Sequence, residues 1–139
     1  MSDETAFRAP LPEDGTEPYW AACNDERLLM QRCDRCQRYR WTPAPICPYC
    51  QAAGCTWTPV SGRGRIHTWT VVTHPVHPAA VARVPYVVVE IALDEQPDLR
   101  LIGNLVDADP ARIAFGARVA AEFVAHPSGQ KLPVFRLTP

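Results

Sequence analysis

Two pairs of closely spaced cysteines constrain this chain more than any other feature. Cys33 and Cys36 form the first Cys-x-x-Cys pair, Cys47 and Cys50 form the second, and ten residues separate the pairs. A two-residue spacer lets both thiolates of a pair point into one turn, so two such turns can supply four sulfur ligands. That ligand set suits Zn²⁺, which is usually four-coordinate and tetrahedral in structural sites. The spacing therefore predicts a closed structural zinc ribbon.

The cellular compartment bears on the same cysteines. The first residues, Met1 to Glu4, are polar and acidic, and no apolar run follows them, so we expect no secretory signal. No stretch approaches the roughly 18–20 apolar residues that span a bilayer. We therefore expect a cytoplasmic chain, in which thiols stay reduced and paired cysteines bind metal more often than they form disulfides. The alternative, three disulfides from the six cysteines, is disfavoured on that ground.

Length, charge and composition limit the possible architectures and partners. A chain of 139 residues fits one compact domain, or a small module joined to one domain. Its formal net charge of −1 does not indicate a membrane surface or a nucleic acid as the partner. Fifteen prolines against seven glycines predict many fixed turns and interrupted strands.

The segment before the cysteines predicts an arm followed by a short helix. Residues 1 to about 14 are polar and show no periodicity, so we expect an arm that is disordered or ordered only against a partner. Thr16 can cap a helix that runs to about Glu26. Tyr19, Trp20 and Cys23 share one face of this helix, and Cys23 is expected to be a buried small apolar residue. Because the helix has few apolar residues, it must dock on something.

After Gly62 the sequence becomes rich in strand-forming residues. Asp109 can cap a short helix to about Phe115, between the third and fourth of the strands expected here. Five strands with a helix in that position fit a partly open OB-fold barrel, and the alternative is another small antiparallel barrel or sandwich. The strands are expected at residues 65–73, 86–93, 99–106, 118–125 and 132–137. Two more are expected beside the first cysteine pair, at 27–32 and 39–41, whereas residues 51–59 are expected only to close the ribbon.

We expect no catalytic residues in this chain. A closed site of four thiolates has no open coordination position, so it cannot activate water or polarise a carbonyl. None of the three serines lies in a nucleophile elbow. Gly62-Arg63-Gly64 is too short for a phosphate-binding loop and is better explained as a bend at the start of a strand.

The joint order of several short motifs resembles one family. The cysteines are preceded by Glu17-Pro18-Tyr19-Trp20 and followed by Gly62-Arg63-Gly64, Pro85-Tyr86-Val87, Gly103-Asn104-Leu105-Val106 and Leu132-Pro133-Val134-Phe135-Arg136. Each motif is weak alone, but together they are similar to the "domain of unknown function 35" family over residues 8–138. The resemblance implies a mainly β chain with an N-terminal arm and docking helix (1–30), a rubredoxin-like zinc ribbon (31–60) and a five-stranded OB-fold barrel (61–139). The sequence departs from the family at residues 94–97, which lack an expected glycine, and we expect this to alter only one hairpin.

The resemblance also implies an accessory subunit rather than a stand-alone enzyme. Members of this family associate with thiolase-like enzymes of the lipid-transfer-protein type, which act on acyl-CoA esters. The most specific expectation is the small, non-catalytic subunit of a hetero-oligomeric aldolase that cleaves a β-hydroxyacyl-CoA, as in steroid side-chain degradation. A thiolase or acyltransferase partner is the next expectation, and some members are joined to hydratases. Two other kinds of function stay open: a single-stranded nucleic-acid binder and a free-standing acyl-CoA carrier.

Five residues are candidate contacts with acyl-CoA or with a partner protein. Four thiolates around Zn²⁺ leave a net charge of −2, and arginines flank the first cysteine pair. Their simplest role is charge compensation, and the alternative is contact with CoA phosphates or an acidic patch of the partner. Two histidines lie in a Pro-bounded loop, where binding residues often occur. The candidates are Arg35, Arg38, Arg40, His74 and His77.

Overall fold

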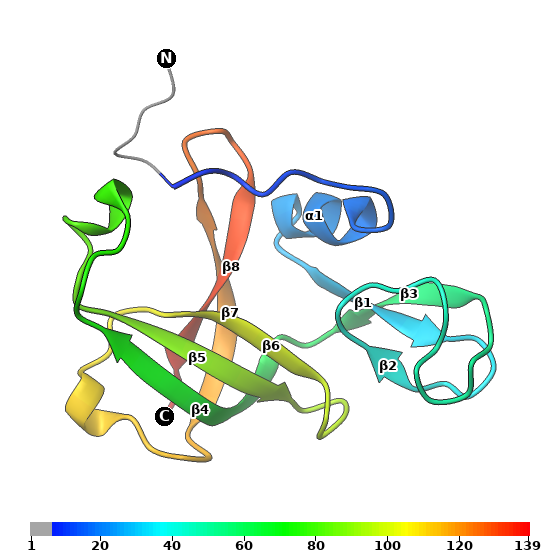
Figure 1. Ribbon diagram of the computed structural model, residues 1–139. Coiled ribbons are helices and arrows are strands. Elements are labelled where there is room, and N and C mark those ends of the chain that lie inside the picture. The colour runs from blue at the N-terminus through cyan, green and yellow to red at the C-terminus, as the bar shows by residue number, and fades with distance from the viewer. Residues whose placement is uncertain (1–6) are drawn as a thin grey trace.

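The computed structural model describes residues 7–139 and is mainly β (Figure 1). One helix is followed by a three-stranded sheet of order β2-β1-β3 and a closed barrel of order β4-β5-β6-β8-β7. The helix and the sheet strands are α1 (Glu17–Asn24), β1 (Leu28–Cys33), β2 (Tyr39–Arg40) and β3 (Cys55–Val60). The barrel contains β4 (Arg63–Val72), β5 (Tyr86–Leu93), β6 (Arg100–Leu105), β7 (Arg118–Ala125) and β8 (Lys131–Leu137), with the short 3₁₀ turns η1 (Pro78–Ala80) and η2 (Pro110–Arg112). Within the described residues, no helix is long and apolar enough to cross a membrane.

The barrel follows the strand pattern that the sequence predicts. β5 shows the reason, because its alternate residues are apolar and are at most 5% exposed. β5 pairs in antiparallel fashion with β4 and β6, and β7 pairs with β4 to close the barrel. The predicted five-stranded barrel of the OB-fold type is confirmed.

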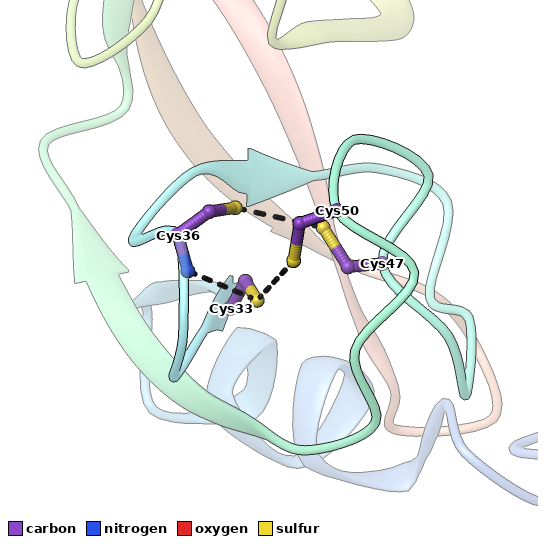
Figure 2. A group of neighbouring side chains, drawn as sticks. All are labelled: Cys33, Cys36, Cys47 and Cys50. Atoms are coloured by element: carbon purple, nitrogen blue, oxygen red, sulfur yellow. Dashed lines mark hydrogen bonds between the residues drawn. The ribbon is translucent and has the colours of Figure 1, made fainter.

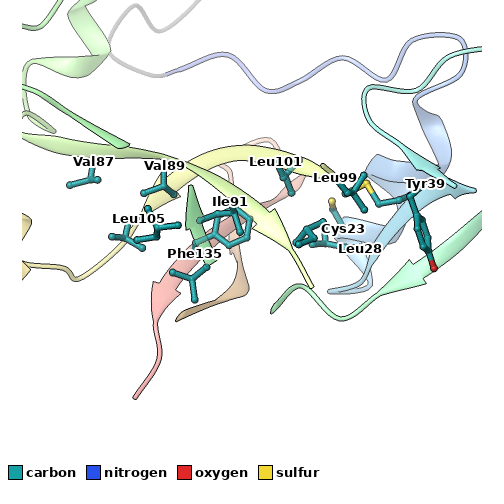
Figure 3. Close-up of a cluster of buried hydrophobic side chains, with 14 of the residues drawn as sticks. Cys23, Leu28, Tyr39, Val87, Val89, Ile91, Leu99, Leu101, Leu105 and Phe135 are labelled. Atoms are coloured by element: carbon teal, nitrogen blue, oxygen red, sulfur yellow. The ribbon is translucent and has the colours of Figure 1, made fainter. Parts of the chain in front are cut away.

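Phe135 on β8 lies at the centre of the barrel core. It is 0% exposed, and Figure 3 shows it beside Val89, Ile91 and Leu105. Gly103 leaves room for its ring, because a Cβ at that position would lie 3.0 Å from the Phe135 ring. The same buried cluster continues past the barrel into α1 and the ribbon, so the two parts of the chain share one core.

Helix α1 docks on its own chain. The predicted apolar face is confirmed, since Tyr19 and Cys23 are buried. The Asn24 side chain accepts a hydrogen bond from the Lys131 backbone N–H at 2.9 Å. These contacts fix α1 against β8. The helix ends at Asn24, two residues before the predicted end.

The start of α1 differs in detail from the prediction. Thr16 occupies the N-cap position, but its side chain makes no capping hydrogen bond to the helix. Its hydroxyl instead donates to the Glu13 carbonyl and accepts from the Glu13 N–H, both at 2.9 Å. Thr16 therefore closes the turn before α1 rather than capping the helix.

In the barrel half, one predicted helix is shorter than expected, and β7, although it has the predicted bounds, is buried at only one end. The helix expected up to Phe115 is only the three-residue turn η2, although Asp109 does accept the hydrogen bond from the Ala111 N–H that a cap predicts. On β7, Val119 points into the core, but Ala125 at the other end is exposed. The β7–β8 hairpin extends beyond the barrel there (Figure 1), so its last residues have no core to face.

β3 is an element that the sequence analysis missed. It pairs with β1 along its full length, from Leu28↔Val60 to Cys33↔Cys55. Pro59 lies within this segment and argues against a central strand. Because β3 is at the edge of its sheet, proline is tolerated there.

Phe7, in the arm, contacts two loops of the barrel. The Phe7 carbonyl oxygen lies 2.6 Å from Nε2 of His126. The Phe7 ring stacks on the His77 ring, with centroids 5.8 Å apart. The Arg83 guanidinium lies 4.7 Å from the centre of the same ring. At Phe7 the expectation of a disordered or partner-ordered arm is therefore wrong, since this residue lies against the barrel loops. Residues 1–6 lie outside the described residues.

The turn between β5 and β6 joins the barrel to the ribbon. The Gln96 side chain accepts from the Tyr39 N–H and donates to the Tyr39 carbonyl, each at 2.9 Å. The Tyr49 hydroxyl donates to Asp98 at 2.8 Å, and this bond lowers the pKa of the Asp98 carboxyl. Residues 94–97, which depart from the family pattern, thus affect the ribbon as well as the β5–β6 hairpin. The expectation that they alter only that hairpin is wrong.

Gln96→Ala is expected to loosen the ribbon from the barrel. The substitution leaves the backbone groups of buried Tyr39 without partners, which should cost about 1–3 kcal/mol of unfolding free energy. Hydrogen exchange should speed up at the Tyr39 amide. The amides of β5 are the internal control and should keep their protection; equal loss in both places would contradict this role for Gln96.

Candidate metal centre

Two equivalent turns carry the four cysteines. In the first, the Gln37 N–H donates to the Cys33 carbonyl at 3.0 Å; in the second, the Gln51 N–H donates to the Cys47 carbonyl at 2.9 Å. Each glutamine directly follows the second cysteine of its pair and adopts a positive φ, 65° and 59°. The left-handed backbone conformation of this glutamine directs the chain away from the cluster, directly after the two cysteines whose thiols face the same point. The sequence thus builds the same knuckle twice.

The sulfur atoms form a compact cluster that fits a tetrahedral ion. All four Sγ atoms lie within 4.8 Å of one another. Contacts cross between the knuckles: Cys33 to Cys50 and Cys36 to Cys47 are each 3.6 Å (Figure 2). A zinc ion with Zn–S bonds of about 2.3 Å requires sulfur separations of about 3.8 Å in a tetrahedron. All six cysteines of the chain are free thiols, so the structure gives the disulfide alternative no support.

The local backbone favours the thiolate form that a metal requires. The Cys36 N–H, 3.5 Å from the Cys33 sulfur, is the main cause of the lowered pKa of Cys33. Burial raises the pKa of Cys47, but hydrogen bonds from the N–H groups of Cys50 and Tyr49 and from the Cys36 and Cys50 thiols together outweigh it and bring the value to about 6. Metal binding needs deprotonated cysteines, and these N–H groups would hold negative sulfur in place.

The cluster is closed by its own ligand set. Cys33 and Cys47 are buried, and Cys36 and Cys50 are partly buried. Four thiolates fill a tetrahedral coordination sphere, so no position is open for water or substrate. Cys55 pairs with Cys33 across the β1–β3 ladder but is outside the cluster. The geometry can therefore hold a fold together and cannot perform zinc catalysis.

The candidate arginines have different surroundings. Arg35 is exposed, and the exposed Arg38 places its guanidinium 4.1 Å from the centre of the Tyr49 ring. Arg40 is only 3% exposed, and its Nε donates to the Gln31 side chain at 2.8 Å. The structure therefore places Arg40 inside the ribbon, whereas Arg35 and Arg38 are on its surface.

The candidate histidines lie far from those arginines. His74 and His77 are in the loop between β4 and β5, which stands at the opposite side of the molecule from the ribbon in Figure 1. Both are exposed, and Nδ1 of His77 accepts a hydrogen bond from the Ala79 N–H at 3.1 Å as the cap of η1. The five candidates thus do not form one site.

A pocket that the sequence analysis did not predict lies between the two halves of the molecule. Tyr19, Trp20 and Trp41 form its aromatic side, and Ile102 and Leu132 are on its barrel side. We call it the aromatic pocket. No local pattern indicates it, because its walls come from five segments that are distant in the sequence.

Comparison with known proteins places both halves of the chain in one family. The family model for the rubredoxin-like zinc ribbon domain of ChsH2 matches residues 20–54, and the model for the ChsH2 C-terminal OB-fold domain matches residues 57–124. A solved structure described as the Ltp2-ChsH2(DUF35) aldolase matches with a TM-score of 0.83 and 32% identity. The match covers 93% of this chain and 98% of that one.

Two relatives are longer proteins. A probable enoyl-CoA hydratase alpha subunit from Thermomonospora curvata is 35% identical over 118 residues, which is 85% of this chain and 36% of the relative. The 3-oxo-4,17-pregnadiene-20-carboxyl-CoA hydratase alpha subunit from Mycobacterium tuberculosis is 29% identical over 126 residues, 90% of this chain and 39% of the relative. This chain thus spans well under half the length of these two relatives. With its zinc ribbon and OB-fold barrel matched along nearly the whole chain, the protein belongs to the DUF35 family, of the ChsH2 type.

Proposed function

We propose that this chain is the non-catalytic accessory subunit of an acyl-CoA aldolase. In this role it binds and stabilises a thiolase-like enzyme of the lipid-transfer-protein type, which supplies the catalytic residues. The observation that carries the proposal is the likeness to a chain of the Ltp2-ChsH2(DUF35) aldolase, because this chain covers 98% of that one. The hydratase alpha subunits, by contrast, contain a further part that this chain does not match.

The zinc site has a structural role in this proposal. Cys33, Cys36, Cys47 and Cys50 would hold one Zn²⁺, and the sulfur separations of 3.6 Å support that assignment. The ribbon around them is small and has few apolar residues of its own, so the ion would supply rigidity that packing cannot. A rigid ribbon keeps α1 and the barrel in a fixed relation for docking.

The described residues offer no convincing catalytic group. A serine–histidine contact does occur, with Ser128 Oγ 2.9 Å from Nδ1 of His126. However, that same Nδ1 accepts the Ser128 backbone N–H at 3.0 Å, and Nε2 of the ring is bonded to the Phe7 carbonyl. The pair is part of an exposed hairpin turn, where it orders the arm. Chemistry is therefore assigned to the partner.

The substrate is proposed to be a β-hydroxyacyl-CoA of the steroid side-chain type. The M. tuberculosis relative is named for a steroid acyl-CoA, and the matched solved structure is described as an aldolase. Exposed Arg35 and Arg38 on the ribbon, and His74 and His77 at the other end, remain proposed contacts for the partner or for CoA phosphates. Arg40 would support the ribbon from inside.

A hydratase complex is the second candidate. The names of both longer relatives favour it, and in that case the partner would add water to an enoyl-CoA instead of cleaving a carbon–carbon bond. Single-stranded nucleic acid fits less well. Such OB-folds join a basic groove to exposed aromatic residues, whereas two arginines on the barrel strands here are held in ion pairs, Arg100 with Glu90 and Arg118 with Asp94.

Reconstitution tests the proposal. The chain, a thiolase-like enzyme encoded beside it, and their mixture would each be assayed with a β-hydroxyacyl-CoA and with the matching enoyl-CoA. We expect carbon–carbon cleavage from the mixture and none from this chain alone. Hydration without cleavage would replace the aldolase by the hydratase candidate. An enzyme whose activity and stability are the same with and without this chain would contradict an accessory role.

A further inference from the structure

The aromatic pocket has the size and lining of a ligand site. Its volume is about 510 Å³, within the range of roughly 300–1,000 Å³ that is usual for small-molecule pockets. The Tyr19 ring lies 4.8 Å from Trp20 and 4.5 Å from Trp41, measured between centroids. These packed rings make a preformed apolar wall, so a ligand would not have to order them.

The pocket exists because two barrel strands separate. Among the described residues, β6 and β8 pair only at Leu105↔Phe135, and the pocket is lined further along by Ile102 of β6 and by Leu132 of β8. Helix α1 and the residues after β2 cover the remaining gap. The opening is therefore built from the ribbon, the helix and the barrel together.

The polar groups at the pocket indicate a neutral, apolar occupant. Glu90 and Arg100 both line it, and their side chains are bonded to each other at 3.2 Å. Because each charge already has a partner, neither requires a counter-charge from a ligand. Ile102 is 68% exposed at this site, and covering such an apolar side chain favours binding by about 25 cal/mol per Å².

We propose that the aromatic pocket binds the hydrocarbon part of an acyl thioester directly on this chain. The source of that ligand rests on the proposed function, but the binding itself is a property of this chain. The occupant is either a fused-ring skeleton or a linear acyl chain, which share the same apolar chemistry. In either case the accessory chain would hold the part of the substrate that is far from the reacting bond.

The four tryptophans provide a direct test. Trp20 and Trp41 line the pocket, whereas Trp57 and Trp69 do not. The zinc-loaded full chain, labelled with 5-fluorotryptophan, would be titrated with sodium cholate as the fused-ring probe and sodium octanoate as the linear probe, both below micelle-forming concentrations. ¹⁹F NMR should show saturable shifts for Trp20 and Trp41 and none for Trp57 and Trp69. The probe that binds more tightly identifies the preferred skeleton.

A matched pair of variants separates the pocket from general surface binding. Ile102→Glu places a charge at the pocket and should weaken probe binding at least about tenfold, which corresponds to about 1.4 kcal/mol. Val76→Glu makes the same change at another exposed aliphatic residue, which lies in the loop between β4 and β5 and does not line the pocket, and should leave binding unchanged. Ile102 is largely exposed, so its replacement should not prevent folding, and unchanged Trp57 and Trp69 signals would verify this.

Three results would overturn the inference. One is the absence of any shift up to the highest probe concentration, and another is an equal shift of all four tryptophans. The third is a shift of Trp20 and Trp41 that appears only when the partner enzyme is added, because the pocket would then be a protein-docking site. If the probes bind but no partner assembles with the chain, the pocket inference stands and the proposed accessory function fails.

Discussion

Replacing Cys33 and Cys47 together by serine is expected to abolish zinc binding and to unfold the ribbon. Each substitution removes one buried sulfur from a different knuckle. Structural zinc sites in small ribbons contribute apparent binding free energies of about 10–16 kcal/mol at neutral pH, which are also folding free energies. The double variant, Cys33→Ser with Cys47→Ser, should therefore lose about one zinc per chain by atomic absorption. Amides of β1 and β3 should lose their protection from hydrogen exchange.

Cys55→Ser is the matched control for that experiment. Cys55 lies opposite Cys33 in the β1–β3 ladder but outside the sulfur cluster, so this variant should keep its zinc and its fold. Stoichiometric zinc retained in the double variant would show that the ligands are assigned wrongly. Loss of zinc in the control would point to the same error.

Phe135→Ala is expected to be the most damaging single substitution in the barrel. The ring is fully buried and fills the space beside Gly103. Removing the ring leaves a cavity, and the side chains around it lose their packing contacts. This should cost about 3–5 kcal/mol of unfolding free energy. Chemical denaturation of the zinc-loaded chain would measure the loss as a lower transition midpoint.

Phe115→Ala tests whether burial, and not the residue type, causes that effect. Phe115 is 75% exposed and contacts the Trp69 ring, with centroids 4.9 Å apart. Losing this pair should cost about 1 kcal/mol or less. Equal destabilisation by the two substitutions would mean that Phe135 is not at the centre of the core.

Local features of the fold could be predicted from the sequence. The cysteine spacing indicates both knuckles, and the alternating apolar residues of β5 indicate a strand with one buried face. Cys23 was expected to be buried from its position on one side of α1, and the structure confirms this. In each case the signal lies within a few residues, where the periods of helices and strands apply.

Features that depend on distant partners could not be predicted. β3 forms because β1 offers a free edge, and its own sequence, with Pro59, does not indicate a strand. Gln96 binds the backbone of Tyr39 although 57 residues separate them. The left-handed conformation of Gln37 is likewise imposed by the knuckle, since glutamine has no preference for it. The walls of the aromatic pocket likewise come from segments that are distant in the sequence.

The zinc ribbon and the barrel are joined into one structural unit. Gln96 and the shared core join the ribbon to the barrel, and Asn24 fixes α1 to β8. A unit of this kind presents fixed surfaces to a partner without contributing catalytic groups. Its proposed contribution to an aldolase is therefore stability and one wall for the acyl group.

Native mass spectrometry of the chain mixed with the thiolase-like enzyme proposed as its partner tests the central claim most directly. The account predicts one stable hetero-oligomer that contains both proteins and one zinc ion for each copy of this chain. It also predicts that the zinc-free double cysteine variant fails to assemble. A zinc-loaded chain that remains a lone monomer at micromolar concentrations of both proteins would contradict the accessory-subunit account.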